Sequence, residues 1–161
     1  MMQKIKLAVY FSFGIVVLGS AILYANYDSW ITLPKVREPV RAIAKDPGSA
    51  QFKAERLTSN GWHCGEMNAK NDYGAYVGFK RFISNVKLGK IYYEGSGLIG
   101  ELNTEEILKT LDKQIAFLKR QNEIKAAGGK VVKYSDSERE RMATQEVFED
   151  HWKEICQPPN N

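Results

Sequence analysis

The stretch GWHCGEMNAKNDYGAYVGFKRF, residues 61–82, decides the fold because two strand-like segments in it are separated by turn-forming residues. The first segment is WHCGEMN (62–68), and the second, YVGFKRFI (76–83), begins inside the stretch and ends just beyond it. Between them, AKNDYGA (69–75) is rich in Asn, Asp and Gly, which favour turns. The stretch therefore predicts a β-hairpin.

Further strands are predicted on both sides of this hairpin. AQFKAERLTS (50–59) alternates imperfectly between apolar and polar residues, and Asn60-Gly61 after it is a typical hairpin dipeptide. GKIYYEG (89–95) predicts a fourth strand, and KVVKY (130–134) can add an edge strand. Successive short strands with turn signals indicate an antiparallel sheet of three to five strands.

Alternation within the segment 76–83 divides its side chains between two faces. We expect one set to face the core, and it consists of Val77, Phe79, Arg81 and Ile83.

Two helices are predicted after the sheet. Asn103 followed by Glu106 predicts a capped start, and Gly128-Gly129 predicts the end near Ala127. Ser135 with Glu138 has the same spacing and predicts a second capped helix. The predicted fold class is α+β, with an antiparallel sheet packed against two C-terminal helices.

The apolar residues of these helices predict how they pack. In the last helix, Phe148, Trp152 and Ile155 fall on one side, which we expect to face inward. In the first, apolar residues recur at spacings of 3, 4 and 3, so we expect a single stripe packed on the sheet. This stripe consists of Leu108, Leu111, Ile115 and Leu118.

The N-terminal segment predicts export. Residues 7–25 carry no charge and in a helix would span about 28 Å, close to the thickness of a bilayer core. Lys4 and Lys6 precede the segment, so we expect the rest of the chain to be exported. The segment is either a retained signal anchor or a signal peptide cleaved after Ala21. The expected organisation is an anchor or signal (1–25), a linker (26–35) and an exported α+β domain (36–161).

The net charge of +4 arises from 23 basic and 19 acidic residues, and without residues 1–25, which hold two lysines and no acid, the exported part has 21 basic and 19 acidic residues. This near balance in the exported part, together with the predicted export, gives little support to nucleic-acid binding. We expect no nucleic-acid partner.

The two cysteines, Cys64 and Cys156, are both expected to point toward apolar surroundings. Cys64 shares a strand face with Trp62, and Cys156 shares a helix face with Trp152. In an oxidising compartment they can form one disulfide that joins the sheet to the last helix; the alternative is two separate buried thiols. The two cysteines and two histidines lack metal-ligand spacing, so we expect no metal and no cofactor.

Catalytic arrangements are weakly indicated. His63 and Cys64 are adjacent on a predicted strand and so point to opposite faces. We expect His63 and His151 to lie at the surface or the rim. Glu66, in the middle of the second strand, is a candidate for a cell-wall-active hydrolase, with a second carboxylate from Glu55, Glu94 or Glu101.

The connection between the second and third strands has two interpretations. Its Asn and Asp side chains can close local turns. Alternatively, the loop displays a polar and aromatic patch that suits recognition of a protein or a saccharide. This patch consists of Asn68, Lys70, Asn71, Tyr73 and Tyr76.

Two motifs resemble a small domain of uncharacterised bacterial and prophage-encoded envelope proteins. The pattern is DP-x-SA-x-F followed by CGE-x-N-x-KN-x-x-G-x-Y-x-GF-x-x-F, and residues 46–82 match it. The matching positions are Asp46, Pro47, Ser49, Ala50, Phe52, Cys64, Gly65, Glu66, Asn68, Lys70, Asn71, Gly74, Tyr76, Gly78, Phe79 and Phe82. The resemblance implies an exported domain in the bacterial envelope and no particular catalytic role.

These observations together predict a protein of the bacterial inner membrane with a periplasmic domain, or a periplasmic protein if the N-terminal segment is cleaved. The expected function is non-enzymatic interaction with an envelope protein, as an adaptor, an inhibitor of the immunity type or an accessory subunit. The alternative is the cell-wall-active hydrolase that uses Glu66.

Overall fold

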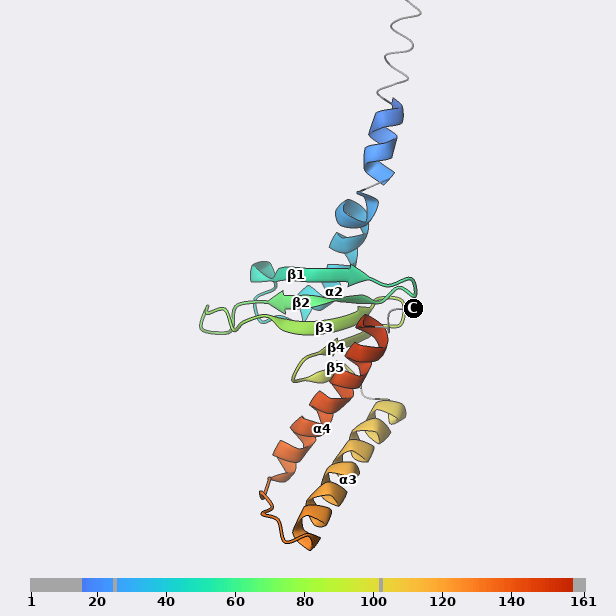
Figure 1. Ribbon diagram of the computed structural model, residues 1–161. Coiled ribbons are helices and arrows are strands. Elements are labelled where there is room, and N and C mark those ends of the chain that lie inside the picture. The colour runs from blue at the N-terminus through green and yellow to red at the C-terminus, as the bar shows by residue number, and fades with distance from the viewer. Residues whose placement is uncertain (1–15, 25, 102, 158–161) are drawn as a thin grey trace, which may run out of the picture. The chain divides into compact units, whose positions relative to one another are not determined.

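Figure 1 shows the computed structural model, which describes residues 16–24, 26–101 and 103–157. The chain divides into two units, with the boundary between Glu38 and Pro39. In the first unit, residues 16–24 are helical and a short π-helix, η1, covers Asp28–Thr32. Within the described residues, no helix combines the length and apolarity needed to cross a bilayer. Most of the segment 7–25 lies outside them, so the expected anchor remains a prediction.

The second unit contains a five-stranded antiparallel sheet, and each strand pairs with the next one along the chain (Figure 1). This topology confirms the predicted antiparallel sheet. A 3-10 turn, η2 (Pro47–Ser49), leads into the first strand. The strands are β1 (Gln51–Leu57), β2 (His63–Asn68), β3 (Lys80–Asn85), β4 (Lys90–Tyr93) and β5 (Gly97–Ile99).

The edge strand differs from the expected one. Residues 130–134 form no strand, and the edge is β5, whose three residues are too few to show a periodic pattern. Gly97 in β5 has a φ of +71°, and a Cβ atom there would lie 2.6 Å from Cγ2 of Thr144. Glycine is therefore required at this position both by the backbone conformation and by the close approach of a helix.

The imperfect alternation of β1 reflects a bulge. The pairing of β1 with β2 shifts between Lys53 and Arg56, and Ala54 adopts a φ of 50°. A bulge turns the side chains that follow it toward a different face. Here the bulge brings Glu55 within 3.0 Å of His63.

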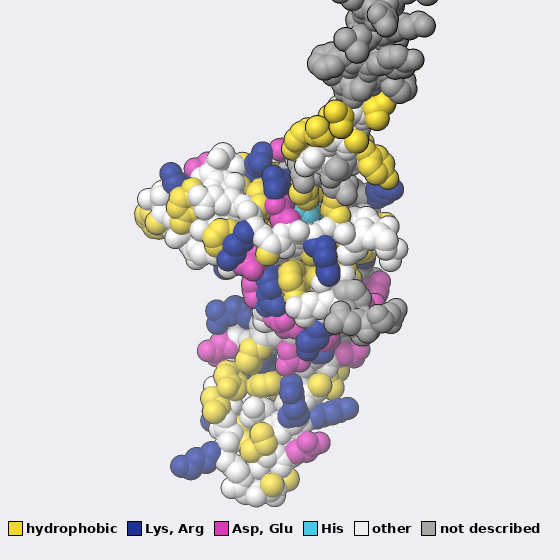
Figure 2. Space-filling view, turned by 45° about the horizontal axis from the view of Figure 1, so that its top comes forward, with side chains coloured by type: hydrophobic (Ala, Val, Ile, Leu, Met, Phe, Trp, Pro, Cys, Tyr) yellow, Lys and Arg dark blue, Asp and Glu magenta, His cyan; other side chains and the backbone are white. Residues whose placement is uncertain are grey.

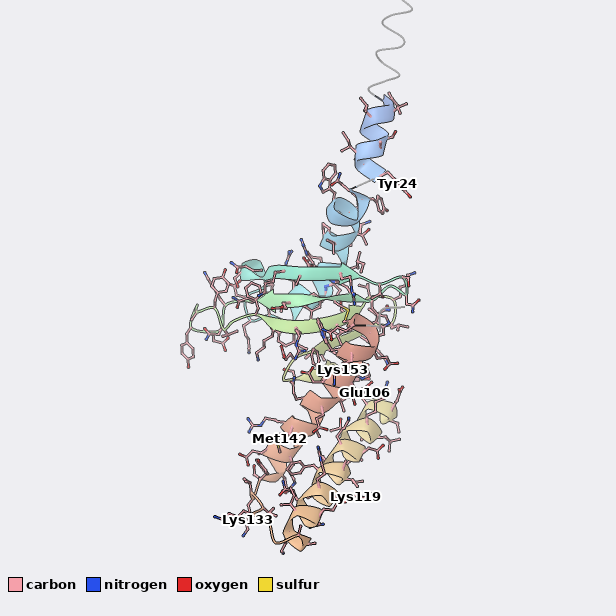
Figure 3. All side chains as sticks on the ribbon, in the orientation of Figure 1. Tyr24, Glu106, Lys119, Lys133, Met142 and Lys153 are labelled. Atoms are coloured by element: carbon pink, nitrogen blue, oxygen red, sulfur yellow. A yellow bond between two sulfur atoms is a disulfide. The ribbon has the colours of Figure 1, made fainter. Side chains whose placement is uncertain are left out.

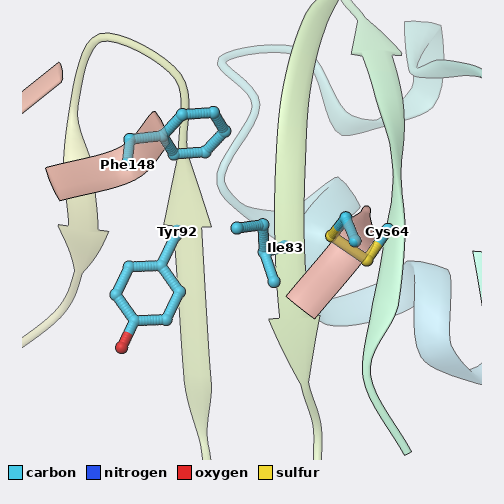
Figure 4. Close-up of a cluster of buried hydrophobic side chains, with 5 residues drawn as sticks. Cys64, Ile83, Tyr92 and Phe148 are labelled. Atoms are coloured by element: carbon cyan, nitrogen blue, oxygen red, sulfur yellow. A yellow bond between two sulfur atoms is a disulfide. The ribbon is translucent and has the colours of Figure 1, made fainter. Parts of the chain in front are cut away.

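The sheet buries side chains on both faces. On one face, Phe82 packs with Met67 and with Val40 of α2 (Leu33–Ala42). On the other, Ile83 packs with Phe148, and the rest of that cluster consists of Cys64, Tyr92 and Cys156 (Figure 4).

The expectation that Val77 and Phe79 face the core is wrong. Both are exposed, because β3 begins only at Lys80 and residues 77–79 belong to the preceding loop. Ile83 is buried as expected, and Phe82 is buried as well, because Val40, Ile43 and Ala44 pack over the second face.

Two helices follow the sheet, as predicted, and lie side by side: α3 (Thr104–Ala126) and α4 (Asp136–His151). Both predicted caps are present. The Glu106 N–H donates to the Asn103 side chain (3.0 Å), and Ser135 forms a complete capping box with Glu138. A π-helical turn, η3 (Trp152–Cys156), completes the C-terminal helix.

The structure contains the predicted disulfide, Cys64–Cys156, with a Cα–Cα distance of 5.9 Å. It joins β2 to η3 across 92 residues of sequence. The predicted inward face of the last helix is also confirmed, since Phe148 is fully buried and Trp152 and Ile155 pack against the same cluster. The C-terminal half of α4 therefore covers one face of the sheet.

The prediction that α3 packs on the sheet through its apolar stripe is wrong. Because α4 and η3 occupy that face, α3 packs on α4 instead, and its only buried residue is Glu106. All four stripe residues, Leu108, Leu111, Ile115 and Leu118, are between 45% and 55% exposed.

Candidate functional site

The loop between β2 and β3, residues 69–79, is held in shape by asparagine side chains at its base. Asn68 is 8% exposed, and its Oδ1 accepts the Gly78 N–H across the loop at 3.0 Å. A bridge between Lys70 and Tyr76 pairs the two arms of the loop. Asn68 therefore shapes the loop from inside instead of being displayed on it.

The tip of the loop is closed by Asn71. Its Oδ1 accepts the N–H groups of Tyr73 (3.0 Å) and Ala75 (3.1 Å), which is an Asx turn. The Gly74 N–H donates to the Asn71 carbonyl, and Gly74 adopts a φ of +76° that other residues rarely reach. The turn-closing interpretation thus accounts for Asn68 and Asn71.

The loop is also tied to the turn before β1. The Lys70 N–H donates to Oγ of Ser49 (2.9 Å), and the Tyr76 hydroxyl donates to the Ser49 carbonyl (3.3 Å). Gln51 Nε2 in turn donates to the Tyr76 hydroxyl. These bonds join segments 21 to 27 residues apart in sequence, so the loop is fixed on two sides.

What the loop displays is apolar and aromatic. Tyr73 is 94% exposed, and Tyr76, Val77 and Phe79 are exposed too. We call Lys70 together with these four residues the loop patch. In Figure 2, hydrophobic and basic side chains lie together on the lobe that this loop forms. Exposed aromatic side chains held on a fixed backbone are typical of protein-binding surfaces.

Two aromatic rings of the loop patch each have a lysine ammonium group close to them. Lys53 Nζ lies 4.1 Å from the centre of the Phe79 ring, and Lys70 Nζ lies 5.7 Å from that of Tyr76. Lys45 lies near the loop as well, 3.9 Å from Asp72. Since Lys45 and Lys53 also pair with carboxylates, Lys70 is the main source of positive charge beside the apolar rings.

A groove of about 370 Å³ opens beside the loop patch. Its lining is mostly apolar and includes two lysine residues, Lys45 and Lys70. The lining residues are Ile43, Ala44, Lys45, Met67, Ala69, Lys70, Asn71, Val77, Tyr93, Ser96 and Ile99. The groove and the loop share Lys70 and Val77, so one partner can contact both.

The carboxylates considered for hydrolysis have separate partners. Glu66 pairs with Lys53 at 3.1 Å, Glu55 pairs with His63, and Glu94 pairs with Arg81. Glu101 is exposed. A glycosidase needs a general acid with a raised pKa, whereas Arg81 lowers the pKa of Glu94.

Arg81 links three elements. Its backbone N–H and its guanidinium bond Glu94 just after β4, and Nη1 donates to Glu149 of α4 at 3.0 Å. The guanidinium lies 5.3 Å from the ring centres of both Phe148 and Trp152. Hydrogen bonds from Arg81 lower the pKa of both carboxylates, and those carboxylates raise the pKa of Arg81. This cluster is a structural clamp between the sheet and α4.

We expect Arg81→Met to lower the free energy of unfolding at pH 7 by about 2–3 kcal/mol, because two carboxylates lose a shared partner. A carboxyl group with a lowered pKa contributes stability above its ordinary pKa of 4.5, and the contribution disappears as pH falls through the folded-state pKa. The difference between variant and wild type should therefore shrink toward pH 3. Urea unfolding at both pH values measures it.

Arg120→Met is the matched control for the clamp. Arg120 bonds only one carboxylate in the described contacts, Glu146, and both side chains are largely exposed. We expect a change below about 0.5 kcal/mol. Equal losses in the two variants, or a difference that is independent of pH, would contradict the clamp.

The expectation that both histidines lie at the surface is wrong. His63 is buried against Phe82 and pairs with Glu55. His151 is buried and donates from Nε2 to Glu106 at 3.2 Å. A histidine can be buried when an acceptor comes with it, and neither acceptor is close to its histidine in sequence.

Sequence analysis missed the second role of Glu106. It was expected as a capping residue, but the residue is 3% exposed and its carboxylate also accepts the Tyr92 hydroxyl at 2.9 Å. Burial, with the nearby Glu106, raises the pKa of Tyr92. Tyr92 and Glu106 line a cavity of about 270 Å³ between α3, α4 and β5. Because the carboxylate is bonded by both Tyr92 and His151, we interpret it as a structural group.

The described residues were also compared with the requirements of a metal site. Across residues 16–24, 26–101 and 103–157, no three His, Cys, Asp or Glu side chains gather closely enough to hold an ion.

No protein-family model, curated protein or solved structure matches this chain. The class is therefore defined by the fold and the site alone. This protein contains a disulfide-bonded α+β domain whose antiparallel sheet carries a braced aromatic loop.

Proposed function

We propose that this protein is a membrane-anchored periplasmic binding protein of the bacterial envelope, which acts by holding another envelope protein. The loop patch is the contact surface. The single observation that carries the proposal is Tyr73, which is 94% exposed on a loop fixed by side-chain hydrogen bonds.

The compartment is inferred from two features. A disulfide is favoured outside the reducing cytoplasm. Residues 16–24 form a helix whose large apolar side chains are exposed in the first unit, which supports burial of this segment in a membrane. The resemblance of residues 46–82 to envelope domains agrees with both.

The loop is suited to binding because it is already ordered. Association costs free energy when side chains and loops must be fixed, and a preformed loop avoids most of that cost. The bonds made by Asn68, Asn71 and Ser49 hold the backbone in place. The free side of Tyr73 then offers a large apolar area to a partner.

The chemistry of the surface indicates the chemistry of the partner. Val77 and Phe79 offer apolar contacts, and the groove beside them has an apolar lining. Lys45 and Lys53 pair with Asp72 and Glu66, whereas Lys70 has no carboxylate partner among the described contacts and adds positive charge. The partner surface is expected to present an apolar side chain beside a carboxylate.

The experiment captures the partner in place. A membrane-impermeant lysine crosslinker is applied to spheroplasts that contain the full chain, and crosslinked proteins are identified by mass spectrometry. We expect one stoichiometric envelope protein. Tyr73→Ala should weaken its binding about thirtyfold, as the loss of a 2 kcal/mol hot spot does.

Leu88→Ala is the matched control, because Leu88 is also an exposed apolar residue but lies in the turn at the opposite end of β3. It should leave capture unchanged. Absence of any partner, or equal capture by the Tyr73 variant and the wild type, would overturn the proposal.

A further inference from the structure

The outer face of α3 is apolar, although nothing in the second unit covers it among the described residues. Its large side chains are between 44% and 55% exposed. We call them the α3 stripe, and they are Ile107, Leu108, Leu111, Ile115 and Leu118. Figure 2 shows hydrophobic side chains exposed over the lower part of the view, which the α3–α4 hairpin forms. Exposed apolar area of this kind on a soluble domain marks an interaction surface.

The inner face of α3 is mostly polar, although Phe117 on it is half-buried against Tyr134. It contacts α4 through Lys113–Asp150 (2.5 Å), Arg120–Glu146 (3.2 Å) and the buried Glu106. Ile107 and Leu111, at one edge of the α3 stripe, line the cavity between α3 and α4, whereas Leu108, Ile115 and Leu118 are not part of its lining. An amphipathic helix normally buries its apolar side, so this orientation leaves most of the stripe for a second molecule.

We propose that the second molecule is another copy of this chain, and that two α3 helices pair antiparallel about a two-fold axis. The spacing of Leu108, Leu111, Ile115 and Leu118 is that of alternating a and d positions in a heptad. Reversing the helix maps this set onto itself: Leu108 meets Leu118 of the copy, and Leu111 meets Ile115. A two-fold interface requires such a self-complementary surface.

The charges beside the stripe select the antiparallel direction. Glu105 and Lys119 occupy e positions near opposite ends of the stripe. In an antiparallel pair, Glu105 of one copy lies beside Lys119 of the other copy. In a parallel pair, an e residue lies opposite the g residue five positions earlier in the partner. Glu105 would then lie opposite Gly100, and Lys119 opposite Gln114. Figure 3 labels Lys119 well along α3 from Glu106, in agreement with a charge separation along the helix.

The antiparallel arrangement also separates the two sheets. The start of α3 is bonded to the sheet through Glu106 and Tyr92. The other end of the helix, Ala126, is about 30 Å further along. Each sheet therefore lies near the far end of the partner helix, and the two sheets are at opposite ends of the pair. The stripe covers only about two heptads, so the dimer is weak and depends on concentration.

One residue works against the pairing. Asp112 is also at an e position and meets its own copy at the two-fold axis. Like charges at that distance repel each other. Asp112→Asn should therefore tighten the dimer several-fold in the antiparallel arrangement and have no such effect in the parallel one.

The test uses the full chain in detergent micelles and sedimentation equilibrium at increasing protein concentration. The wild type should dimerise, and Ile115→Asp should weaken dimerisation at least tenfold. Ile115 lines no part of the cavity beside Glu106, so the fold is expected to survive. Val132→Asp, which alters an exposed valine outside the stripe, is the control and should dimerise as the wild type does.

Cysteine crosslinking determines the direction. Both native cysteines are in the disulfide, so an introduced thiol is the reactive one. A mixture of Leu111→Cys and Ile115→Cys proteins should form the mixed crosslink, and neither protein should crosslink efficiently alone. Crosslinking of Leu111→Cys alone would overturn the antiparallel arrangement.

Two further outcomes overturn the proposal. One is a monomeric wild type at 100 µM or more (roughly the upper limit for a weak specific dimer). The other is a dimer that Ile115→Asp does not weaken. A monomeric wild type whose capture of an envelope protein is abolished by Ile115→Asp would assign the stripe to that partner. Because the loop patch is tested by Tyr73→Ala, failure of the dimer leaves the proposed function intact.

Discussion

Replacing both cysteines with alanine is expected to lower the free energy of unfolding by about 4 kcal/mol. The disulfide joins Cys64 to Cys156 across 92 residues, and opening so long a loop increases the conformational entropy of the unfolded chain. The two sulfur atoms also lie in the buried cluster with Ile83 and Phe148, so truncation removes packing (Figure 4). Guanidinium unfolding of oxidised wild type and of the double variant measures the loss.

Reduction of the wild type is the control for this prediction. Dithiothreitol should destabilise the wild type by a similar amount and leave the double variant unchanged, because the variant has no bond to reduce. The single variants Cys64→Ala and Cys156→Ala should resemble the double variant, since each breaks the same bond. A loss below about 1 kcal/mol would contradict the assigned role of the disulfide.

The parts of the fold that the sequence predicted depend on local signals. The Asn60-Gly61 dipeptide, the caps at Asn103 and Ser135, and the short strands are each determined within a few residues. The disulfide was predictable because only two cysteines are present, and each lies beside apolar residues. Such features can be predicted without knowing which elements pack against each other.

The parts that the sequence did not predict depend on contacts between distant segments. Periodicity placed Leu111 and Ile115 on one face of α3, but it did not show that α4 already covers the sheet. Likewise, burial of His63 depends on a bulge that moves Glu55 toward it. Strand β5 has only three residues, fewer than the period-2 pattern needs to be recognised.

The candidate site was predicted in part. Its location in residues 68–76 came from the density of Asn, Gly and Tyr. The different roles of its residues were not predicted, because Asn68 and Tyr73 were both assigned to one displayed patch. Only the structure separates Asn68, which bonds Gly78 inside the loop, from Tyr73, which points to solvent.

Glu106→Ala is expected to cost about 3–4 kcal/mol, although the residue stands in the first turn of a helix where acidic residues are usually exposed. Its carboxylate accepts from Tyr92 and His151, and both donors stay buried when it is removed. Thermal or urea unfolding measures the loss.

Glu105 provides the matched control for Glu106. It occupies the preceding position, but its carboxylate is largely exposed and bonds only Lys109 among the described contacts. Glu105→Ala should therefore change stability little, so equal effects of the two variants would contradict a buried acceptor at Glu106.

Tyr92→Phe removes one donor, and the loss caused by Glu106→Ala should be smaller in that background because one fewer buried group is left without a partner. If the double-mutant cycle shows no such coupling, Glu106 stabilises the start of α3 through the helix alone. The link between α3, β4 and α4 would then have to be attributed to other contacts.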